Sequence, residues 1–211
     1  MKKLLLLLAM TAAALTGAAA HPHMSLVSKL EFEYDGPECR GFWLDWTFDP
    51  YFSASIIQER DADRNGRFDA AEIRSVHDLA FINLRKFGFF TFIRVGNLRR
   101  SPEKVERFTA EIRGDRLAYR FYVDLSGSGY GEDFSVAVID TGYFCAVSYP
   151  PAAAEVRQLR AGFPAPKWEL TANKDYPVHY DPSQSSSDTK THSAWKPGLQ
   201  TVYPEEIRAR F

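Results

Sequence analysis

The chain has 211 residues, 45% of them hydrophobic, and a formal net charge of −1 at pH 7. This length is sufficient for one domain with a buried core. The near-neutral charge excludes strong sequence-independent binding of nucleic acids through bulk positive charge, so no nucleic-acid partner is expected.

Residues 1–20 have the pattern of a secretory signal peptide. Two lysines precede an apolar run over residues 4–15, and Ala18-Ala19-Ala20 forms a small-residue cleavage site. The run is too short to cross a bilayer comfortably, and no later segment reaches the necessary length. We therefore expect cleavage after Ala20, a periplasmic or secreted location, and no transmembrane segment in the mature chain. A retained N-terminal anchor is the alternative.

Cleavage at this position would make His21 the first residue, with His23 two positions later. The free α-amine and the two imidazole rings then offer three nitrogen ligands of the kind that copper, nickel, cobalt and zinc prefer. The square-planar amino-terminal site with histidine in third place is excluded, because Pro22 has no amide proton to lose. A chelate by the amine and His21, joined by His23 or a distant ligand, is the remaining hypothesis. A disordered polar terminus is the alternative.

The first expected elements are a hairpin followed by two helices. Residues 25–48 alternate apolar and charged side chains on both sides of the turn sequence at 35–38, which predicts a β-hairpin. Residues 51–60 and 70–86 are interpreted as helices around a polar loop, and residues 89–95 as a further strand.

The loop between these helices reads "DADRNGRFDAAE" over residues 61–72 and fits the twelve-residue EF-hand calcium loop. Oxygen-bearing side chains stand at positions 1, 3, 5, 9 and 12, and Gly66 at position 6 permits the sharp turn. The predicted ligands are Asp61, Asp63, Asn65, the main-chain carbonyl of Arg67, Asp69 and Glu72. A solvated acidic turn is the alternative. Because no convincing second loop pairs with this one, a structural calcium ion is expected rather than a sensor.

The second half of the chain continues the alternating pattern. Residues 108–123 and 136–147 are expected to form two more hairpins, and residues 152–160 a short helix. Successive hairpins favour an α+β fold in which antiparallel β-hairpins form a sheet, with the EF-hand-like unit inserted at 51–86. We expect one such domain over residues 21–172 and a polar C-terminal tail, 173–211, that packs on it.

Four further residues are candidates for a disulfide bond or for metal binding. Cys39 and Cys145 are expected to form a disulfide, because export to an oxidising compartment favours pairing; two separate buried thiols are the alternative. His179 and His192 lie in the polar tail and could complete a second nitrogen and oxygen site together with the N-terminus.

No catalytic pattern is evident in the sequence. It contains no Gly-x-Ser-x-Gly, no His-Glu-x-x-His and no phosphate-binding glycine loop. With both cysteines expected in a disulfide, a thiol nucleophile is not expected either. A protein without enzymatic activity is therefore the first interpretation. A copper enzyme that uses the terminal histidine and a second imidazole is an alternative.

Four stretches together resemble a known family: "AHPH" at the cleavage site, "WTFDPYFS" at 46–53, the loop at 61–72 and "NLRKFGFFTFIRV" at 83–95. The chain resembles DUF1007, an uncharacterised family of secreted bacterial proteins described as a periplasmic component of an ABC-type transport system. The resemblance covers most of residues 20–150. It implies an association with nickel, cobalt or zinc permeases and exporters, and a metal-handling role for His21 and His23.

The combined expectation is a periplasmic accessory protein that holds calcium in its EF-hand loop and assists the transport or homeostasis of nickel, cobalt or zinc, with nickel, cobalt, zinc or copper as the possible second bound ion. A small chaperone, sensor or buffer that docks onto a membrane permease or exporter is expected. A non-catalytic interaction module, stabilised by calcium and with inert histidines, is the alternative.

Overall fold

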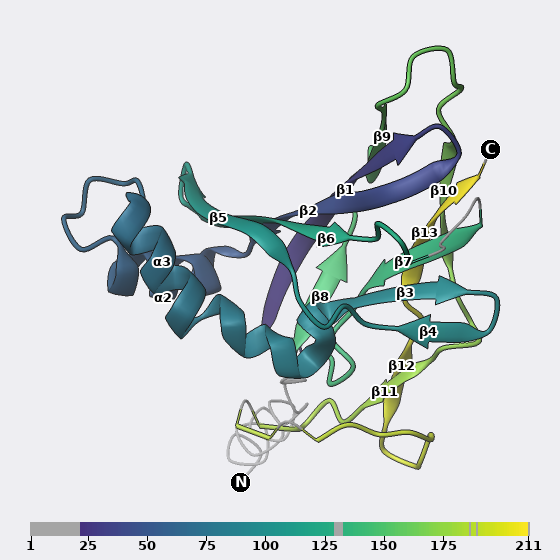
Figure 1. Ribbon diagram of the computed structural model, residues 1–211. Helices are drawn as coiled ribbons and strands as arrows, with labels where there is room; N and C mark the ends of the chain where they lie inside the picture. The colour runs from purple at the N-terminus through teal and green to yellow at the C-terminus, as the bar shows by residue number, and fades with distance from the viewer. Residues whose placement is uncertain (1–21, 129–132, 186, 189, 211) are drawn as a thin grey trace, which may run out of the picture.

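The computed structural model describes residues 22–128, 133–185, 187–188 and 190–210. Most of this structure is β-sheet, and the helices gather at one end beside the strands (Figure 1). The predicted α+β class fits this arrangement. None of the described helices combines the length and apolar character that crossing a bilayer requires.

The first sheet has the strand order β5-β6-β2-β1-β8. β8 pairs with residues 24–27 of β1, and β9 pairs with residues 30–34 of the same strand. Its strands are β1 (Met24–Asp35), β2 (Glu38–Phe48), β5 (Glu106–Arg113), β6 (Arg116–Asp124), β8 (Cys145–Ser148) and β9 (Ala154–Gln158). The hairpins predicted over 25–48 and 108–123 are confirmed as the antiparallel pairs β1–β2 and β5–β6.

The second sheet has the order β10-β13-β7-β3-β4, and a small third sheet pairs β11 with β12. These strands are β3 (Thr91–Val95), β4 (Leu98–Arg100), β7 (Phe134–Val138), β10 (Lys167–Ala172), β11 (Val178–Tyr180), β12 (Gln200–Val202) and β13 (Glu205–Arg210). The ring of Phe32 on β1 lies 5.9 Å from that of Phe134 on β7, so the two larger sheets share one apolar core.

Alternation along the strands explains which face enters this core. On β1, Leu30 and Phe32 are fully buried, while Glu31 between them is more exposed. On β2 the corresponding set is Phe42, Leu44 and Trp46, also fully buried. Because side chains on a strand point alternately to opposite faces, one face of the hairpin supplies a large part of the aromatic core.

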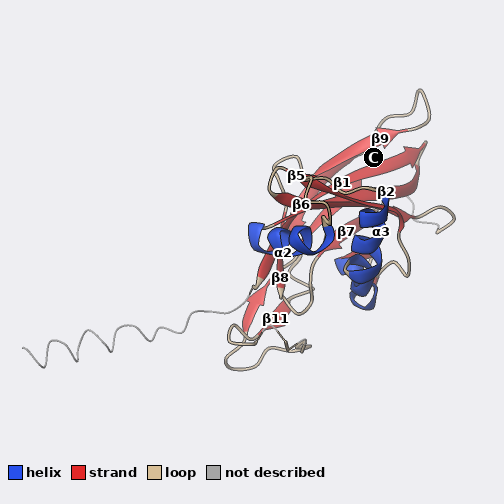
Figure 2. Cartoon of the chain, turned by 90° about the vertical axis from the view of Figure 1, so that its left-hand side faces the viewer, coloured by secondary structure: helices blue, strands red, loops and turns tan. Residues whose placement is uncertain are grey.

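The helical part consists of α2 (Pro50–Arg60), α3 (Ala70–Leu79) and the 3-10 segment η2 (Phe81–Phe90). Figure 2 shows these helices beside the extended strands, and α2 packs on β6 while α3 packs on β5. The helix predicted over 70–86 ends earlier, at Leu79, and the 3-10 segment η2 follows it. The strand predicted from residue 89 begins at Thr91 instead, because Phe89 and Phe90 both have left-handed backbone, with φ of 51°.

Two other predictions about secondary structure were wrong. Residues 136–147 do not form a hairpin: β7 lies in the second sheet, and β8 pairs in parallel with β1 in the first. Residues 152–160 do not form a helix, since β9 pairs in parallel with β1. Residues 173–211, expected as a polar tail that packs on the domain, include β13, which lies inside the second sheet between β10 and β7. In each case, pairing with a distant strand outweighs the local pattern.

The predicted disulfide between Cys39 and Cys145 was also wrong, since both are buried free thiols. Both cysteines belong to the first sheet, but they lie beside opposite ends of β1. Cys39 pairs with Tyr34 and Cys145 with Met24. Met24 and Tyr34 are ten positions apart on β1, which corresponds to roughly 33 Å at about 3.3 Å per residue. A disulfide needs Cα atoms within about 7 Å of each other.

We expect neither thiol to react in the folded protein and both to react after unfolding without reductant. Burial raises the pKa of Cys39 to about 12 and also raises the pKa of Cys145, so neither forms the reactive thiolate near neutral pH. Mass spectrometry after treatment with iodoacetamide, with and without denaturant, measures this directly. Labelling that requires prior reduction would contradict the free-thiol state.

Candidate functional site

The candidate site is the loop of residues 61–69 that joins α2 to α3. The start of α2 is fixed by Asp49, whose Oδ1 accepts hydrogen bonds from the backbone N–H groups of Tyr51 (2.8 Å) and Phe52 (3.1 Å). Pro50 stands at the first helical position, where its missing N–H is not needed. These features set the direction in which the chain enters the loop.

One buried hydroxyl attaches α2 to the first sheet. Ser53 is fully buried, and its Oγ donates to the carbonyl of Phe48 at 3.4 Å and accepts from the N–H of Leu117 on β6 at 2.9 Å. A small polar side chain therefore occupies a position where an amphipathic helix would ordinarily carry an apolar one. The contact holds the loop at a defined distance from the sheet.

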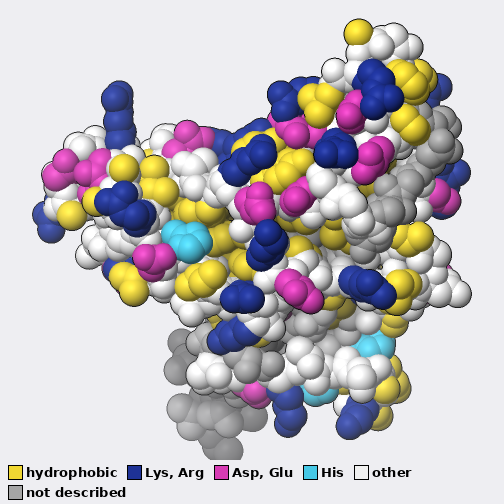
Figure 3. All heavy atoms as spheres, viewed as in Figure 1, with side chains coloured by type: hydrophobic (Ala, Val, Ile, Leu, Met, Phe, Trp, Pro, Cys, Tyr) yellow, Lys and Arg dark blue, Asp and Glu magenta, His cyan; other side chains and the backbone are white. Residues whose placement is uncertain are grey.

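The loop gathers three carboxylates. One oxygen each of Asp61, Asp63 and Glu72 lie within 4.8 Å of one another, and this is the only such group of three metal-ligating side chains among the described residues. Asp61 and Glu72 are buried, with 6% and 9% of their surfaces exposed. Figure 3 shows acidic side chains at the outer tip of the helical part, where this loop lies.

Backbone N–H groups hold these carboxylates in place. The two oxygens of Asp61 accept from Asn65 at 3.1 Å and from Gly66 at 3.0 Å, and Glu72 Oε1 accepts from Ala62 at 2.8 Å. Gly66 has φ of 76°, the left-handed backbone that its place in the sequence predicts. The loop thus folds around its own acidic side chains, and Glu72 reaches back to the first turn of the loop.

Asp69 lies outside this group of three and has another contact. It is the N-cap of α3, where its Oδ1 accepts from the N–H groups of Ala71 (2.7 Å) and Glu72 (2.8 Å). Glu72 Oε2 accepts in return from the N–H of Asp69 at 2.9 Å, which completes a capping box. Sequence analysis missed this role, although an acidic residue three positions before a glutamate at a helix start indicates it.

Asn65 and Arg67 complete the loop beside Asp63. The amide of Asn65 donates to Asp63 Oδ2 at 2.7 Å, and its Oδ1 accepts from the N–H of Arg67 at 2.8 Å. The residues that sequence analysis selected therefore provide carboxylate and amide oxygens. An all-oxygen donor set with net negative charge suits a hard divalent cation such as calcium or magnesium better than a soft one.

The histidines are arranged differently. His179 and His192 face each other in an isolated antiparallel bridge, and His179 Nδ1 lies 2.8 Å from the hydroxyl of Thr201. His23 Nε2 lies 3.4 Å from the carbonyl oxygen of Gln184, so the C-terminal segment reaches the start of the first strand. Within the described residues, however, no histidine joins a group of three metal-ligating side chains.

His21 lies outside the residues that the structure describes, as does the predicted signal peptide.

His77 is a packing residue at the end of α3. Its Nδ1 lies 2.6 Å from Asp78, and its ring lies 5.9 Å from that of Phe81 and 5.4 Å from that of Phe108.

Comparisons with known proteins give a family and few further details. A protein from Spirochaeta aurantia, described as an uncharacterized 15.5 kDa protein in the trpE 3′ region, is 30% identical over 70 residues. That match covers 33% of the present chain and 50% of the relative, so the chain spans about half the length of this relative. No solved structure matches. The family model described as protein of unknown function (DUF1007) matches residues 6–211. Since that match covers nearly the whole length, the chain belongs to the DUF1007 family.

Proposed function

We propose that this protein is a periplasmic metal-binding accessory protein without enzymatic activity, and that residues 61–72 hold a calcium ion as an EF-hand loop. The observation that supports this most strongly is the group of Asp61, Asp63 and Glu72, whose oxygens lie within 4.8 Å of one another. Two of these three carboxylates are buried, and a cation between them would offset the repulsion among their charges.

The residues present fit calcium, which takes about six to eight oxygen ligands in flexible geometry. Asp61, Asp63 and Asn65 offer side-chain oxygens, and the main-chain carbonyl of Arg67 adds another. Glu72 can add two oxygens. Each of them accepts one backbone N–H and still has a lone pair available for the ion. Calcium can therefore bind while the capping hydrogen bonds of α3 remain intact.

The proposed role of calcium is structural. Ser53 attaches the helix before the loop to the first sheet, and the helix after the loop packs on β5. An ion held by Asp61 at the end of α2 and by Glu72 on α3 would fix these two helices relative to each other. Titration of metal-free protein with calcium, followed by calorimetry and by thermal unfolding, tests this. One bound ion per chain and a higher melting temperature are expected; no heat and no shift would contradict it.

A second candidate function, transition-metal binding in support of a membrane permease or exporter, rests on the pair His179 and His192. Residues directly opposite in an antiparallel bridge have Cβ atoms about 4.5–5.5 Å apart, which places two imidazoles within reach of one ion. The contact of His179 Nδ1 with Thr201 orients the ring and leaves Nε2 for a metal. Nickel, cobalt, zinc and copper all accept imidazole ligands, and the terminal amine and ring of His21 would complete the site.

We expect His192→Ala to lower the affinity for zinc by about tenfold or more, because one of two facing imidazoles is lost. Competition with a chelator of known affinity measures this, with His77→Ala as the matched control. Calcium binding is expected to stay the same in both variants. An unchanged zinc affinity in His192→Ala would contradict the site while leaving the calcium proposal intact.

A further inference from the structure

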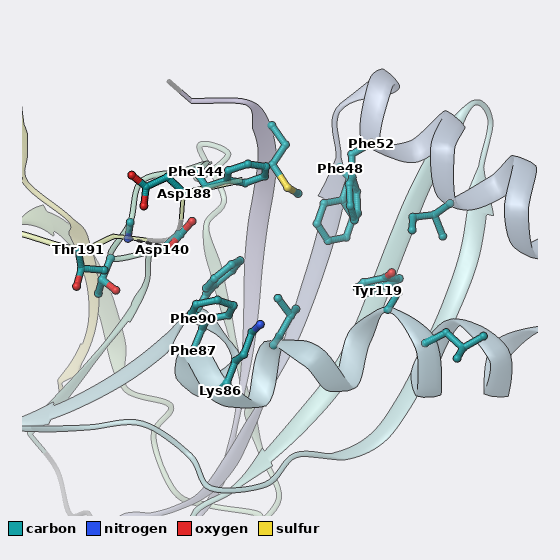
Figure 4. Close-up of a pocket in the computed structure, with 17 residues that line it drawn as sticks. Phe48, Phe52, Lys86, Phe87, Phe90, Tyr119, Asp140, Phe144, Asp188 and Thr191 are labelled. Atoms are coloured by element: carbon teal, nitrogen blue, oxygen red, sulfur yellow. Dashed lines mark hydrogen bonds between the residues drawn. The ribbon is translucent and has the colours of Figure 1, made fainter. Parts of the chain in front are cut away.

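A cavity of about 440 Å³ lies between the helical part and the sheets, and neither the three loop carboxylates nor the two facing histidines belong to its lining (Figure 4). Its volume falls within the roughly 300–1,000 Å³ range of small-molecule sites. The lining is mostly apolar and comes from segments far apart in the sequence: β1, β2, α2, α3, η2, β6, the turn after β7, and residues 188 and 191.

Aromatic rings stand at two places around this cavity. Phe48 on β2 and Phe52 on α2 lie together with ring centroids 4.8 Å apart. Phe87 and Phe90 on η2 form a second pair, 6.0 Å apart. Figure 4 shows the two pairs on either side of a common space, which Ile56 also lines. A long apolar group could extend between the pairs and bury its surface against them.

The backbone that carries Phe90 is held in an unusual conformation. Gly88, Phe89 and Phe90 have φ of 62°, 51° and 51°, which L-residues adopt rarely. A side chain at Gly88 would lie 2.4 Å from Ser101, and the carbonyl of Phe90 accepts from the N–H of Ile139 at 2.7 Å. Such conformations persist where the surroundings fix them, and they concentrate at binding sites. The position of the Phe90 ring on the wall is therefore set by the fold.

Lys86 brings a positive charge to this apolar space. Figure 4 shows its ammonium group directed into the cavity, and Nζ lies 4.9 Å from the ring centroid of Phe87. Among the described residues, no ion pair joins Lys86 to a carboxylate.

The two carboxylates at the other end of the cavity already accept hydrogen bonds from the backbone. Asp140 accepts from the N–H groups of Gly142 (2.9 Å) and Cys145 (3.1 Å), and Asp188 accepts from the N–H of Lys190 (3.0 Å). These carboxylates keep their negative charges, so an anionic end group would be attracted to Lys86, the one cationic side chain in the described lining.

We propose that this cavity binds a fatty acid, with the acyl chain between the aromatic pairs and the carboxylate on Lys86 Nζ. The apolar walls account for the chain, and the ammonium group accounts for an anionic end group. The neutral and cationic analogues of the same chain length are the competing ligands that separate these two contributions. The proposal does not depend on calcium or on the histidines.

The test compares laurate, 1-dodecanol and dodecylamine in a calorimetric titration of the purified protein. We expect laurate to bind most tightly and dodecylamine least. Lys86→Gln should weaken laurate roughly tenfold or more, as expected for the loss of a charge-assisted hydrogen bond, and leave dodecanol unchanged. Lys104→Gln is the control, since Lys104 is an exposed lysine outside the cavity lining that pairs with Glu106.

The location of binding is measured separately, with a photo-reactive laurate and peptide mass spectrometry. Labels on the segments around Phe52 or Phe90 would support the proposal. Absence of laurate binding, tighter binding of dodecylamine than of laurate, or labels confined to other segments would overturn it.

Discussion

Glu72→Gln is expected to abolish the stabilisation of the protein by calcium. At a calcium concentration a hundredfold above the dissociation constant, binding to the folded state alone adds about 2.7 kcal/mol to the free energy of unfolding. For a chain of this size that corresponds to a rise in melting temperature of about 5–10 °C. The variant loses the charge and the bidentate carboxylate that close the loop, so its melting temperature should not respond to calcium.

The glutamine side chain keeps an acceptor oxygen for the N–H of Asp69, so the helix cap and the fold should persist in the variant. Glu59→Gln is the matched control, because Glu59 is an exposed residue near the end of α2 whose carboxylate pairs with Arg60. It should show the full calcium response. An equal response in Glu72→Gln and wild type would show that the loop is not the calcium site.

Glu206→Gln is expected to lower the free energy of unfolding by about 3–5 kcal/mol, the usual cost of breaking a buried ion pair. Glu206 lies on β13 inside the second sheet and is only 3% exposed. Its Oε2 accepts from Arg94 Nε at 2.9 Å and from Ser135 Oγ at 2.6 Å, and its Oε1 accepts from Asn173 at 2.9 Å. One carboxylate thus joins three strand or loop segments that are far apart in the sequence.

The same carboxylate predicts how this stabilisation varies with pH. Burial opposes ionisation of Glu206, but the hydrogen bonds from Arg94, Ser135 and Asn173 outweigh it and hold its pKa below the ordinary value of 4.5. A carboxyl with a lowered folded-state pKa stabilises the fold fully above its unfolded-state pKa. That contribution is lost as the pH falls through the folded-state pKa.

The difference in unfolding free energy between wild type and Glu206→Gln should therefore be constant above about pH 5 and shrink below pH 4.5. Urea unfolding at a series of pH values measures it. Glu205→Gln, at the exposed neighbouring position on the same strand, is the control and should change stability by less than about 0.5 kcal/mol. A difference independent of pH down to pH 2 would contradict the ionised state of Glu206.

Local patterns in the sequence were sufficient where partners are close along the chain. The hairpin over 25–48 follows from side-chain alternation on both sides of a turn, and β5 pairs with β6 across Gly114, whose φ is 67°. The acidic loop was found for the same reason, because its residues lie within twelve positions. Spacing alone brought Asp61, Asp63 and Glu72 into one group, but it did not reveal that Asp69 is the N-cap of α3.

Long-range pairing explains what the sequence did not reveal. The parallel neighbours of β1 come from residues 145–158, and nothing in that local pattern distinguishes a strand that joins a distant edge from a hairpin arm or a short helix. The C-terminal strand looks polar because four of its six residues are charged, but its buried Glu206 pairs with Arg94, which is 112 positions away. The disulfide prediction failed because compartment and cysteine number carry no information about distance.

The sequence by itself therefore determined the α+β character, the two adjacent hairpins and the acidic loop, because these depend on contacts between near neighbours. Only the tertiary structure decided the assignment of strands to two sheets, the separation of the cysteines along β1, and the cavity that Lys86 faces. Each of these depends on which distant segments lie side by side, and that is a property of the packed chain as a whole.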